Sequence, residues 1–114
     1  MTAEPEYVDG FRDLGLSEGD TVLIHSSLIS FNWREYGGIE ELATVIFDSL
    51  YEVLGEEGTI IVPTFSFSFT DDSPNGYWNF VESESEMGVF TEYVRSHPES
   101  TRTVHPFYSF AIFG

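Results

Sequence analysis

The 114-residue sequence contains no cysteine, which excludes disulfide bonds and thiolate metal sites. It also contains no lysine, so its four basic residues are all arginine, against 20 aspartate and glutamate residues. The net charge of −16 argues against nucleic-acid binding, because nucleic-acid-binding proteins present a basic surface. No apolar run is long enough to cross a membrane, and the polar, acidic start of the chain differs from a secretory signal peptide. We therefore expect a cytoplasmic protein.

The composition nevertheless indicates a folded domain. Hydrophobic residues make up 41% of the chain and aromatic residues 17%, which excludes intrinsic disorder despite the high charge. A domain this acidic repels itself in dilute buffer, and molar salt relieves the repulsion by shortening the screening length to about 3 Å. The composition therefore predicts adaptation to a salt-rich cytoplasm. The length allows one domain at most.

A strand–helix–strand pattern organises the first half of the chain. Thr21–Ile24 is a short, mostly β-branched apolar run typical of a buried strand, and Thr59–Val62 is a second such run. Between them, apolar residues recur every three or four positions from Ile39 to Leu54, which predicts one long helix that ends at Gly55. We predict an α/β fold with an open central β-sheet, a parallel βαβ unit and flanking helices.

Two shorter helices and an aromatic segment are predicted around this unit. Glu6–Leu16 has the pattern of an amphipathic helix with Val8, Phe11 and Leu14 on one face, and Met87–Ser96 has a similar pattern. After Pro63, phenylalanine alternates with serine over residues 64–69, which predicts a strand or extended segment. Residues 70–86 are acidic and rich in turn formers, and predict a long loop.

The last predicted element is a buried strand at Phe110–Phe113. Soluble domains usually end in polar, frayed residues, so a core strand at this place predicts that its covering layer lies further on. We expect residues 1–114 to be the N-terminal part of a single domain, truncated after a core strand. Such a part should expose an apolar patch beside that strand and should aggregate or form a homodimer.

The loop after the first strand is the predicted ligand site. Ligands of open α/β sheets bind outside the carboxyl ends of the strands. Four residues follow the strand directly: His25, Ser26, Ser27 and Leu28. The pair Gly37 and Gly38 precedes the long helix, whose free N–H groups and positive dipole end attract an anion such as phosphate or pyrophosphate. The alternative is that the glycines only form a tight turn and the serines only bind loop backbone.

Other chemistry is weakly indicated. His105 and Asp71 or Asp72 could contribute to a metal site, but no His-x-x-x-His or His-Glu-x-x-His spacing occurs, so we predict no bound metal. No Gly-x-Ser-x-Gly motif indicates a serine nucleophile. A lone histidine at the end of a strand, such as His25, more often binds loop backbone than takes part in catalysis.

Several motifs occur in an order that resembles the aminoglycoside 3-N-acetyltransferase family. They are Gly-Asp-Thr-Val-Leu-Ile-His-Ser-Ser-Leu (19–28), Gly-Gly (37–38), Leu-Gly-Glu-Glu-Gly-Thr (54–59), Val-Pro-Thr-Phe (62–65), Met-Gly (87–88), Thr-Glu (91–92), Arg102 and His-Pro-x-x-Ser (105–109). The resemblance runs from about Leu14 to the last residue. The aromatic segment after Pro63 and Gly-Val-Phe-Thr-Glu-Tyr (88–93) are most similar to members associated with sugar and polysaccharide biosynthesis.

The resemblance implies acetyl transfer from acetyl-CoA to the amine of an amino sugar or aminoglycoside. It also implies that residues 25–28 and the Gly37–Gly38 pair hold the pantetheine and pyrophosphate of CoA. Residues around Thr64, Met87–Gly88, His105 and Ser109 would line the same cleft. Asp71 and Asp72 would then face a cationic substrate. The segment 82–86 is more acidic than the corresponding part of the family.

The general base is the missing part of this picture. The family's catalytic histidine lies in a second half that this chain does not contain, which leaves His105 as the candidate base within it. Two other classes of protein stay open. One is a pseudoenzyme that binds CoA without catalysis, and the other is a metal-dependent hydrolase on a similar sheet.

Overall fold

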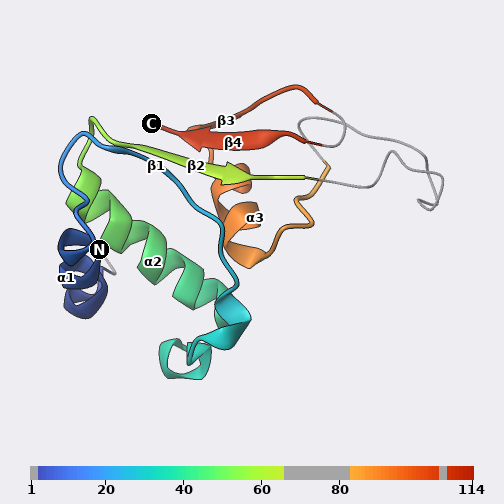
Figure 1. The fold of residues 1–114 in the computed structure, drawn as a ribbon. Coiled ribbons are helices and arrows are strands. Elements are labelled where there is room, and N and C mark those ends of the chain that lie inside the picture. The colour runs from blue at the N-terminus through green and yellow to red at the C-terminus, as the bar shows by residue number, and fades with distance from the viewer. Residues whose placement is uncertain (1–2, 66–82, 106–107) are drawn as a thin grey trace.

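The computed structural model describes residues 3–65, 83–105 and 108–114 (Figure 1). Its elements, in chain order, are α1 (Pro5–Asp13), β1 (Thr21–Leu23), the 3-10 helices η1 (Leu28–Ser30) and η2 (Trp33–Tyr36), α2 (Ile39–Leu54), β2 (Thr59–Pro63), α3 (Val89–Ser96), β3 (Ser100–Arg102) and β4 (Phe110–Phe113). The described strands form one sheet in the order β1–β2–β4–β3. Helices α2 and α3 lie on one side of this sheet, and α1 packs against α2 (Figure 1).

The predicted βαβ unit is confirmed. β1 and β2 are parallel neighbours, with Val22 opposite Ile60, and α2 connects them over the predicted range. β4 runs antiparallel to both β2 and β3, so the sheet is mixed. The helix ends at Gly55, whose φ of 69° lies in the left-handed region that favours glycine.

The core lies between α2, α3 and one face of the sheet. Val22, Ile60, Val62 and Ala111 point to this face and are buried with the apolar stripe of α2. Fully burying one large aliphatic or aromatic side chain stabilises a fold by about 1.5–3 kcal/mol. The buried residues of α2 are Leu42, Ala43, Ile46, Phe47, Ser49, Leu50, Val53 and Leu54.

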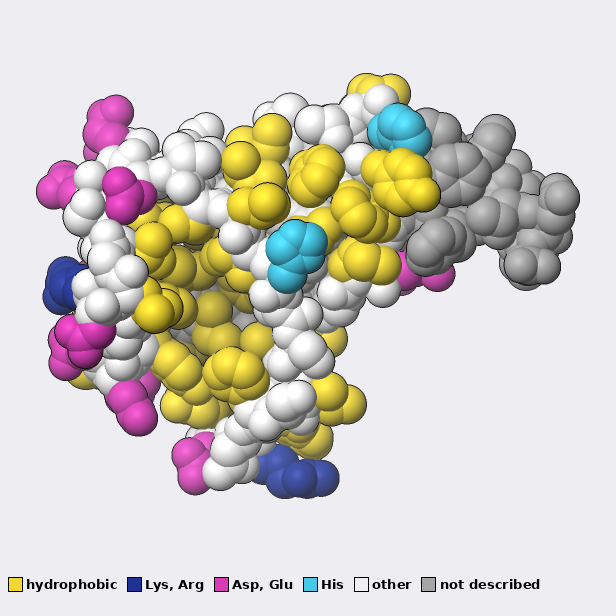
Figure 2. Space-filling view, viewed as in Figure 1, with side chains coloured by type: hydrophobic (Ala, Val, Ile, Leu, Met, Phe, Trp, Pro, Cys, Tyr) yellow, Lys and Arg dark blue, Asp and Glu magenta, His cyan; other side chains and the backbone are white. Residues whose placement is uncertain are grey.

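Among the described residues, the opposite face of the sheet carries exposed and half-buried apolar side chains. Leu23, Ile61 and Ile112 are aligned across β1, β2 and β4, and side chains alternate along a strand, so all three point away from α2 and α3. Leu23 is 57% exposed, and Ile61 and Ile112 are half-buried. Hydrophobic side chains gather over the strands in Figure 2.

Several sequence predictions are corrected by the structure. α1 ends at Asp13 rather than at Leu16, and Leu14, expected on its buried face, is 81% exposed. α3 begins at Val89 rather than at Met87, because Gly88 has a φ of 115° that no helix contains. β3 was not predicted at all. Most of the predicted extended segment and acidic loop, residues 66–82, lies outside the described residues.

The predicted strand at Phe110–Phe113 is confirmed, but only part of it lacks cover. The Phe113 ring packs against Phe47 at 4.8 Å between ring centroids and against His97 at 4.7 Å. Phe110 and Ile112 lie half-buried on the opposite face. No helix within the described ranges is long and apolar enough to span a membrane.

Candidate functional site

The loop between β1 and η1 lies beside the start of α3. A Cβ atom added at Gly88 would lie 3.8 Å from the carbonyl oxygen of Ser26. His25 and Ser27 are exposed, Ser26 is half-buried and Leu28 is buried. The structure therefore brings the predicted cofactor loop next to the N-terminus of α3, at the Met87–Gly88 pair that the family resemblance implies lines the same cleft.

An apolar cavity of about 460 Å³ opens beside this loop. Its volume lies within the range of small-molecule sites, and its walls are mostly hydrophobic side chains, visible as a hollow in Figure 2. Such a cavity fits a neutral, flexible ligand segment better than a charged one. The lining residues are Tyr7, Phe11, Leu14, Leu16, Val22, Leu23, Ile24, His25, Ser26, Leu28, Phe31, Ile46, Leu50 and Phe90.

The predicted anion site at the start of α2 is filled by the protein's own groups. The Gly38 N–H donates to the carbonyl oxygen of Trp33, and the Gly37 N–H donates to that of Arg34, both at 3.3 Å. A Cβ atom added at Gly38 would lie 2.4 Å from the Oε2 atom of Glu41, so this carboxylate packs against Gly38. A pyrophosphate placed here would have to displace the Glu41 side chain.

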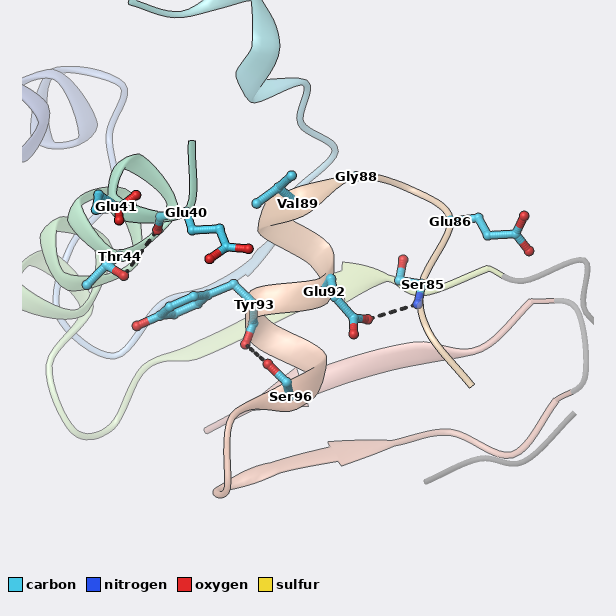
Figure 3. A pocket seen from close by; sticks show the side chains of 10 residues that line it. All are labelled: Glu40, Glu41, Thr44, Ser85, Glu86, Gly88, Val89, Glu92, Tyr93 and Ser96. Carbon is cyan, nitrogen blue, oxygen red and sulfur yellow. Dashed lines mark hydrogen bonds between the residues drawn. The ribbon is translucent and has the colours of Figure 1, made fainter. Parts of the chain in front are cut away.

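A second cavity, of about 730 Å³, lies between α2 and α3 and is acidic (Figure 3). Four of the residues around it are glutamates: Glu40, Glu41, Glu86 and Glu92. The surrounding carboxylates attract cations and repel phosphate groups. The remaining lining residues are Thr44, Ser85, Gly88, Val89, Tyr93 and Ser96.

One of these glutamates is firmly held. Glu92 accepts hydrogen bonds from the Arg95 guanidinium at 2.6 Å and from the Ser85 N–H at 2.9 Å (Figure 3 draws the second). Burial tends to raise the pKa of Glu92, but these hydrogen bonds outweigh burial and hold its pKa below the ordinary value. Glu92 is therefore an ionised part of the cavity wall.

Thr64 and Ser109, predicted to line the cofactor cleft, lie in the protein interior. Both are fully buried, and their hydroxyl oxygens are 2.9 Å apart. The Arg102 guanidinium donates to the Ser109 hydroxyl at 2.9 Å, to the Thr64 carbonyl at 2.8 Å and to the Ser83 carbonyl. In this structure the two hydroxyls connect β2 to β4, so any effect on a cofactor would be indirect.

The structure describes only one of the residues predicted for catalysis and substrate binding. His105 is exposed, and its Nδ1 atom accepts a hydrogen bond from the Tyr108 N–H at 2.9 Å. A neutral imidazole with Nδ1 as acceptor carries its proton on Nε2, so this conformation closes a turn and offers no free lone pair to a substrate amine. Asp71 and Asp72 lie outside the described residues. Within the described ranges, no three histidine or acidic side chains are grouped closely enough to hold a metal ion.

A family model described as aminoglycoside 3-N-acetyltransferase matches residues 23–114. The chain belongs to the aminoglycoside 3-N-acetyltransferase family. The match confirms the family predicted from the motifs, and it includes the loop at residues 25–28, the Gly37–Gly38 pair, α2 and α3.

Relatives of this acetyltransferase-family chain are about twice as long as it is. The SPbeta prophage-derived aminoglycoside N(3')-acetyltransferase-like protein YokD of Bacillus subtilis (strain 168) is 34% identical over 125 residues, which cover 93% of this chain and 44% of YokD. The crystal structure of YokD matches 95% of this chain and 48% of the solved chain with a TM-score of 0.78. The chain therefore spans about half the length of the relatives it matches.

Two other solved structures share the fold. A variant of aminoglycoside acetyltransferase AAC(3)-IVa in complex with apramycin is 27% identical to this chain and has a TM-score of 0.74. The match covers 98% of this chain and 43% of the AAC(3)-IVa chain. AAC-IIIb in a binary complex with CoASH is 19% identical to this chain and has a TM-score of 0.73. The match covers 98% of this chain and 46% of the AAC-IIIb chain. The second likeness establishes the fold alone. Together they confirm the predicted α/β architecture.

Proposed function

We propose that the chain is the CoA-binding, N-terminal part of an acetyltransferase domain that transfers an acetyl group from acetyl-CoA to the amine of an amino sugar or aminoglycoside. The observation that carries the proposal is the apolar cavity beside residues 25–28, at the carboxyl end of β1, in a member of an acetyltransferase family. The complexes of AAC(3)-IVa with apramycin and of AAC-IIIb with CoASH illustrate the ligands that proteins of this fold hold.

The residues of this chain would bind and orient the acetyl donor. The cavity would take the neutral, flexible pantetheine arm, with Ser26 among the lining residues. The pyrophosphate would lie at the start of α2, where N–H groups in the first turn of the helix and the exposed Arg34 favour an anion once Glu41 has moved. Glu40 and Glu41 lie in the same turn and also line the acidic cavity, so both carboxylates would oppose the pyrophosphate until they turn away from it.

Acetyl transfer then requires a neutral amine next to the thioester. The amine nitrogen attacks the carbonyl carbon, a general base takes the amine proton, the C–S bond breaks, and CoA leaves as the thiol. Because His105 closes a turn in the structure, we expect the base to come from the part of the domain that the relatives have beyond this chain's matched length. The 114-residue chain alone should therefore bind CoA but show no acetyl transfer.

A charge change at Glu41 tests the position of the pyrophosphate. Glu41→Gln removes a carboxylate that competes with the anion, so it should tighten CoA binding, by about twofold to fivefold at low ionic strength, the effect of one charge at a helix N-terminus, and by less in molar salt. Gly38→Asp should weaken binding by like-charge repulsion and steric block. The measurement is calorimetry with CoA in molar KCl, and the exposed Glu52→Gln at the far end of α2 is the matched control. Equal affinities for Glu41→Gln and Glu52→Gln would contradict the placement.

A second candidate function is CoA binding without catalysis, for which the apolar cavity beside residues 25–28 would suffice. Acetyl-CoA turnover against a panel of amino sugars and aminoglycosides separates the two: turnover by the 114-residue chain would make His105 the leading base and refute the need for a further part. The acidic composition supports a salt-rich cytoplasm as the setting, so these assays belong in molar salt.

A further inference from the structure

Residues 83–88, which we call the entry segment of α3, connect the acidic cavity to the cofactor loop at residues 25–28. Three of them line the acidic cavity. At the end of the segment, a Cβ atom added at Gly88 would lie 3.8 Å from the Ser26 carbonyl oxygen. Phe90, in the first turn of α3, is buried and lines the apolar cavity. The place of the entry segment therefore sets part of the wall of the proposed CoA site.

Thr91 holds the entry segment through a chain of hydrogen bonds. The Thr91 side chain is fully buried, and its hydroxyl donates to the Gly88 carbonyl oxygen at 2.7 Å. Because that proton is already committed, the Ser85 hydroxyl is the donor in the 2.7 Å bond between the two hydroxyl groups. The Ser85 oxygen in turn accepts a hydrogen bond from the Met87 N–H at 3.1 Å. One buried hydroxyl thus fixes the turn that leads into α3.

Glu92 holds the same segment by a charge-assisted bond. Its Oε1 atom accepts a hydrogen bond from the Ser85 N–H at 2.9 Å, which Figure 3 draws. The Arg95 guanidinium binds both carboxylate oxygens at 2.6 Å, and such bidentate pairing fixes the orientation of the carboxylate. Gly88, the N-cap residue of α3, has no side chain that could bind the first turn, so residues within the helix fix its start instead.

We propose that Thr91 and Glu92 are positioning residues of the acetyl-donor site. They fix the entry segment so that Gly88 supports the cofactor loop at Ser26 and Phe90 keeps its place in the wall of the apolar cavity. This inference rests on the proposed function in taking that loop and that cavity as the CoA site. Neither Thr91 nor Glu92 is among the described residues that line the apolar cavity, so both act through their neighbours.

The other part of the entry segment is anchored independently. The Glu86 N–H donates to the Phe65 carbonyl oxygen at 2.9 Å, and the Ser83 carbonyl accepts a hydrogen bond from the Arg102 guanidinium. Substitution of Thr91 should therefore release the end of the segment near the cofactor loop without detaching the segment from the sheet. A local loss of order at the site is expected, rather than loss of the fold.

Two simpler roles for these residues predict different results. If Glu92 acts only through its charge, its removal should tighten CoA binding, because a carboxylate repels the phosphate groups of CoA. If the hydrogen bonds only stabilise the fold, an equally destabilising substitution elsewhere should affect CoA binding to the same extent. Positioning predicts weaker binding after the loss of Glu92 and unchanged binding in a destabilised control.

Four variants of the 114-residue chain separate these roles. Thr91→Val removes the hydroxyl with little change of shape, and Thr91→Ser retains it. Glu92→Gln removes the charge and one acceptor oxygen. Gly58→Ala, between α2 and β2, is the control for general loss of stability, because its Cβ would lie 2.4 Å from the Leu54 Cβ. Circular dichroism first establishes that each variant is folded. CoA affinity is then measured by calorimetry in molar KCl, and the amide resonances of residues 25–28 are recorded by NMR without CoA.

Thr91→Val should weaken CoA binding about fivefold and Glu92→Gln about tenfold, the effects of losing one neutral and one charge-assisted hydrogen bond. Thr91→Ser and Gly58→Ala should bind CoA as the natural chain does. The amide resonances of residues 25–28 should shift in the first two variants and stay in place in the other two.

Unchanged or tighter CoA binding by folded Glu92→Gln would overturn the proposal, and so would an equal loss of affinity in Gly58→Ala. If Thr91→Val does not fold, the comparison of Glu92→Gln with Gly58→Ala decides the question. A natural chain that does not bind CoA would reject the proposed function, and the resonances of residues 25–28 would then decide the positioning role alone. CoA binding with equal affinity in the natural chain, Thr91→Val and Glu92→Gln would support the function and reject the positioning role.

Discussion

Replacing Arg102 by lysine should destabilise the protein far more than a conservative exchange usually does. Arg102 is 9% exposed, and its guanidinium donates to three acceptors on separate segments: the Ser109 hydroxyl, the Thr64 carbonyl and the Ser83 carbonyl. Its planar fork reaches all three at once, whereas a lysine ammonium is a point charge at the end of one flexible stem. Arg102→Lys therefore keeps the charge but satisfies about one of the three acceptors.

The magnitude follows from the number of bonds lost. A hydrogen bond to a charged group contributes about 1.5–3 kcal/mol, and two are lost, but the remaining ammonium and local relaxation recover part of the difference. We expect Arg102→Lys to lower the free energy of unfolding by about 2–4 kcal/mol, out of about 5–15 kcal/mol for a typical domain. With a urea slope of about 2 kcal/mol per molar, the midpoint should fall by roughly 1–2 M.

Urea titrations followed by circular dichroism in molar KCl measure this change. Arg12→Lys is the matched control, because Arg12 is exposed in the last turn of α1, and we expect it to shift the free energy by no more than about 0.5 kcal/mol. Ser109→Ala alone and combined with Arg102→Lys completes a double-mutant cycle, which should give a coupling above about 0.5 kcal/mol. A shift for Arg102→Lys equal to that of Arg12→Lys would refute the reasoning.

Two further predictions concern packing and acid stability. Gly58→Ala should lower the free energy of unfolding by about 1–3 kcal/mol, because the added Cβ would clash with the Leu54 Cβ. Gly10→Ala, with open space around it in α1, should raise the free energy of unfolding by about 0.5–1 kcal/mol. Equal urea midpoints for the two variants would be inconsistent with this packing. Glu92 has a lowered pKa in the folded state, so its ionised form stabilises the fold above the ordinary pKa of 4.5 and loses that contribution as the pH falls below it. The difference in free energy of unfolding between the natural protein and Glu92→Gln should therefore shrink on acidification below about pH 5. The exposed control Glu52→Gln should show no such trend. A difference for Glu92→Gln that is independent of pH would argue against a lowered pKa of Glu92 in the folded state.

The central βαβ unit was predictable because its signals are local. The stripe from Ile39 to Leu54 and the apolar runs beside it define helix and strands without reference to distant residues. β3 was not predictable from the sequence, because Ser100–Arg102 has no alternation of apolar and polar residues. Its extended conformation depends on pairing with β4. The strand propensity of such a segment depends on the neighbouring strand as much as on its own residues.

The position of the loop in the candidate site was predictable, but the contacts of the other site residues were not. His25, Ser26 and Leu28 line the apolar cavity, as their place after a strand predicts, whereas Ser27 does not. The burial of Thr64 with Ser109 depends on a contact across 45 positions, which a single sequence does not reveal. The Glu41 carboxylate against Gly38 did carry a signal, since a glutamate three residues after a helix N-cap is the position that folds back onto the cap.

The place of β4 between β2 and β3 sets an order of assembly. β1, α2 and β2 are consecutive in the chain and can associate early, but β3 joins the sheet only through β4, which is made after it. During synthesis, residues 100–102 therefore lack a strand partner, and Arg102 lacks the Ser109 hydroxyl, until residues 109–113 have emerged. A nascent chain should accordingly pass through a stage in which the βαβ unit is formed while a guanidinium destined for the interior still faces water, and the final hairpin should dock as one late, cooperative step.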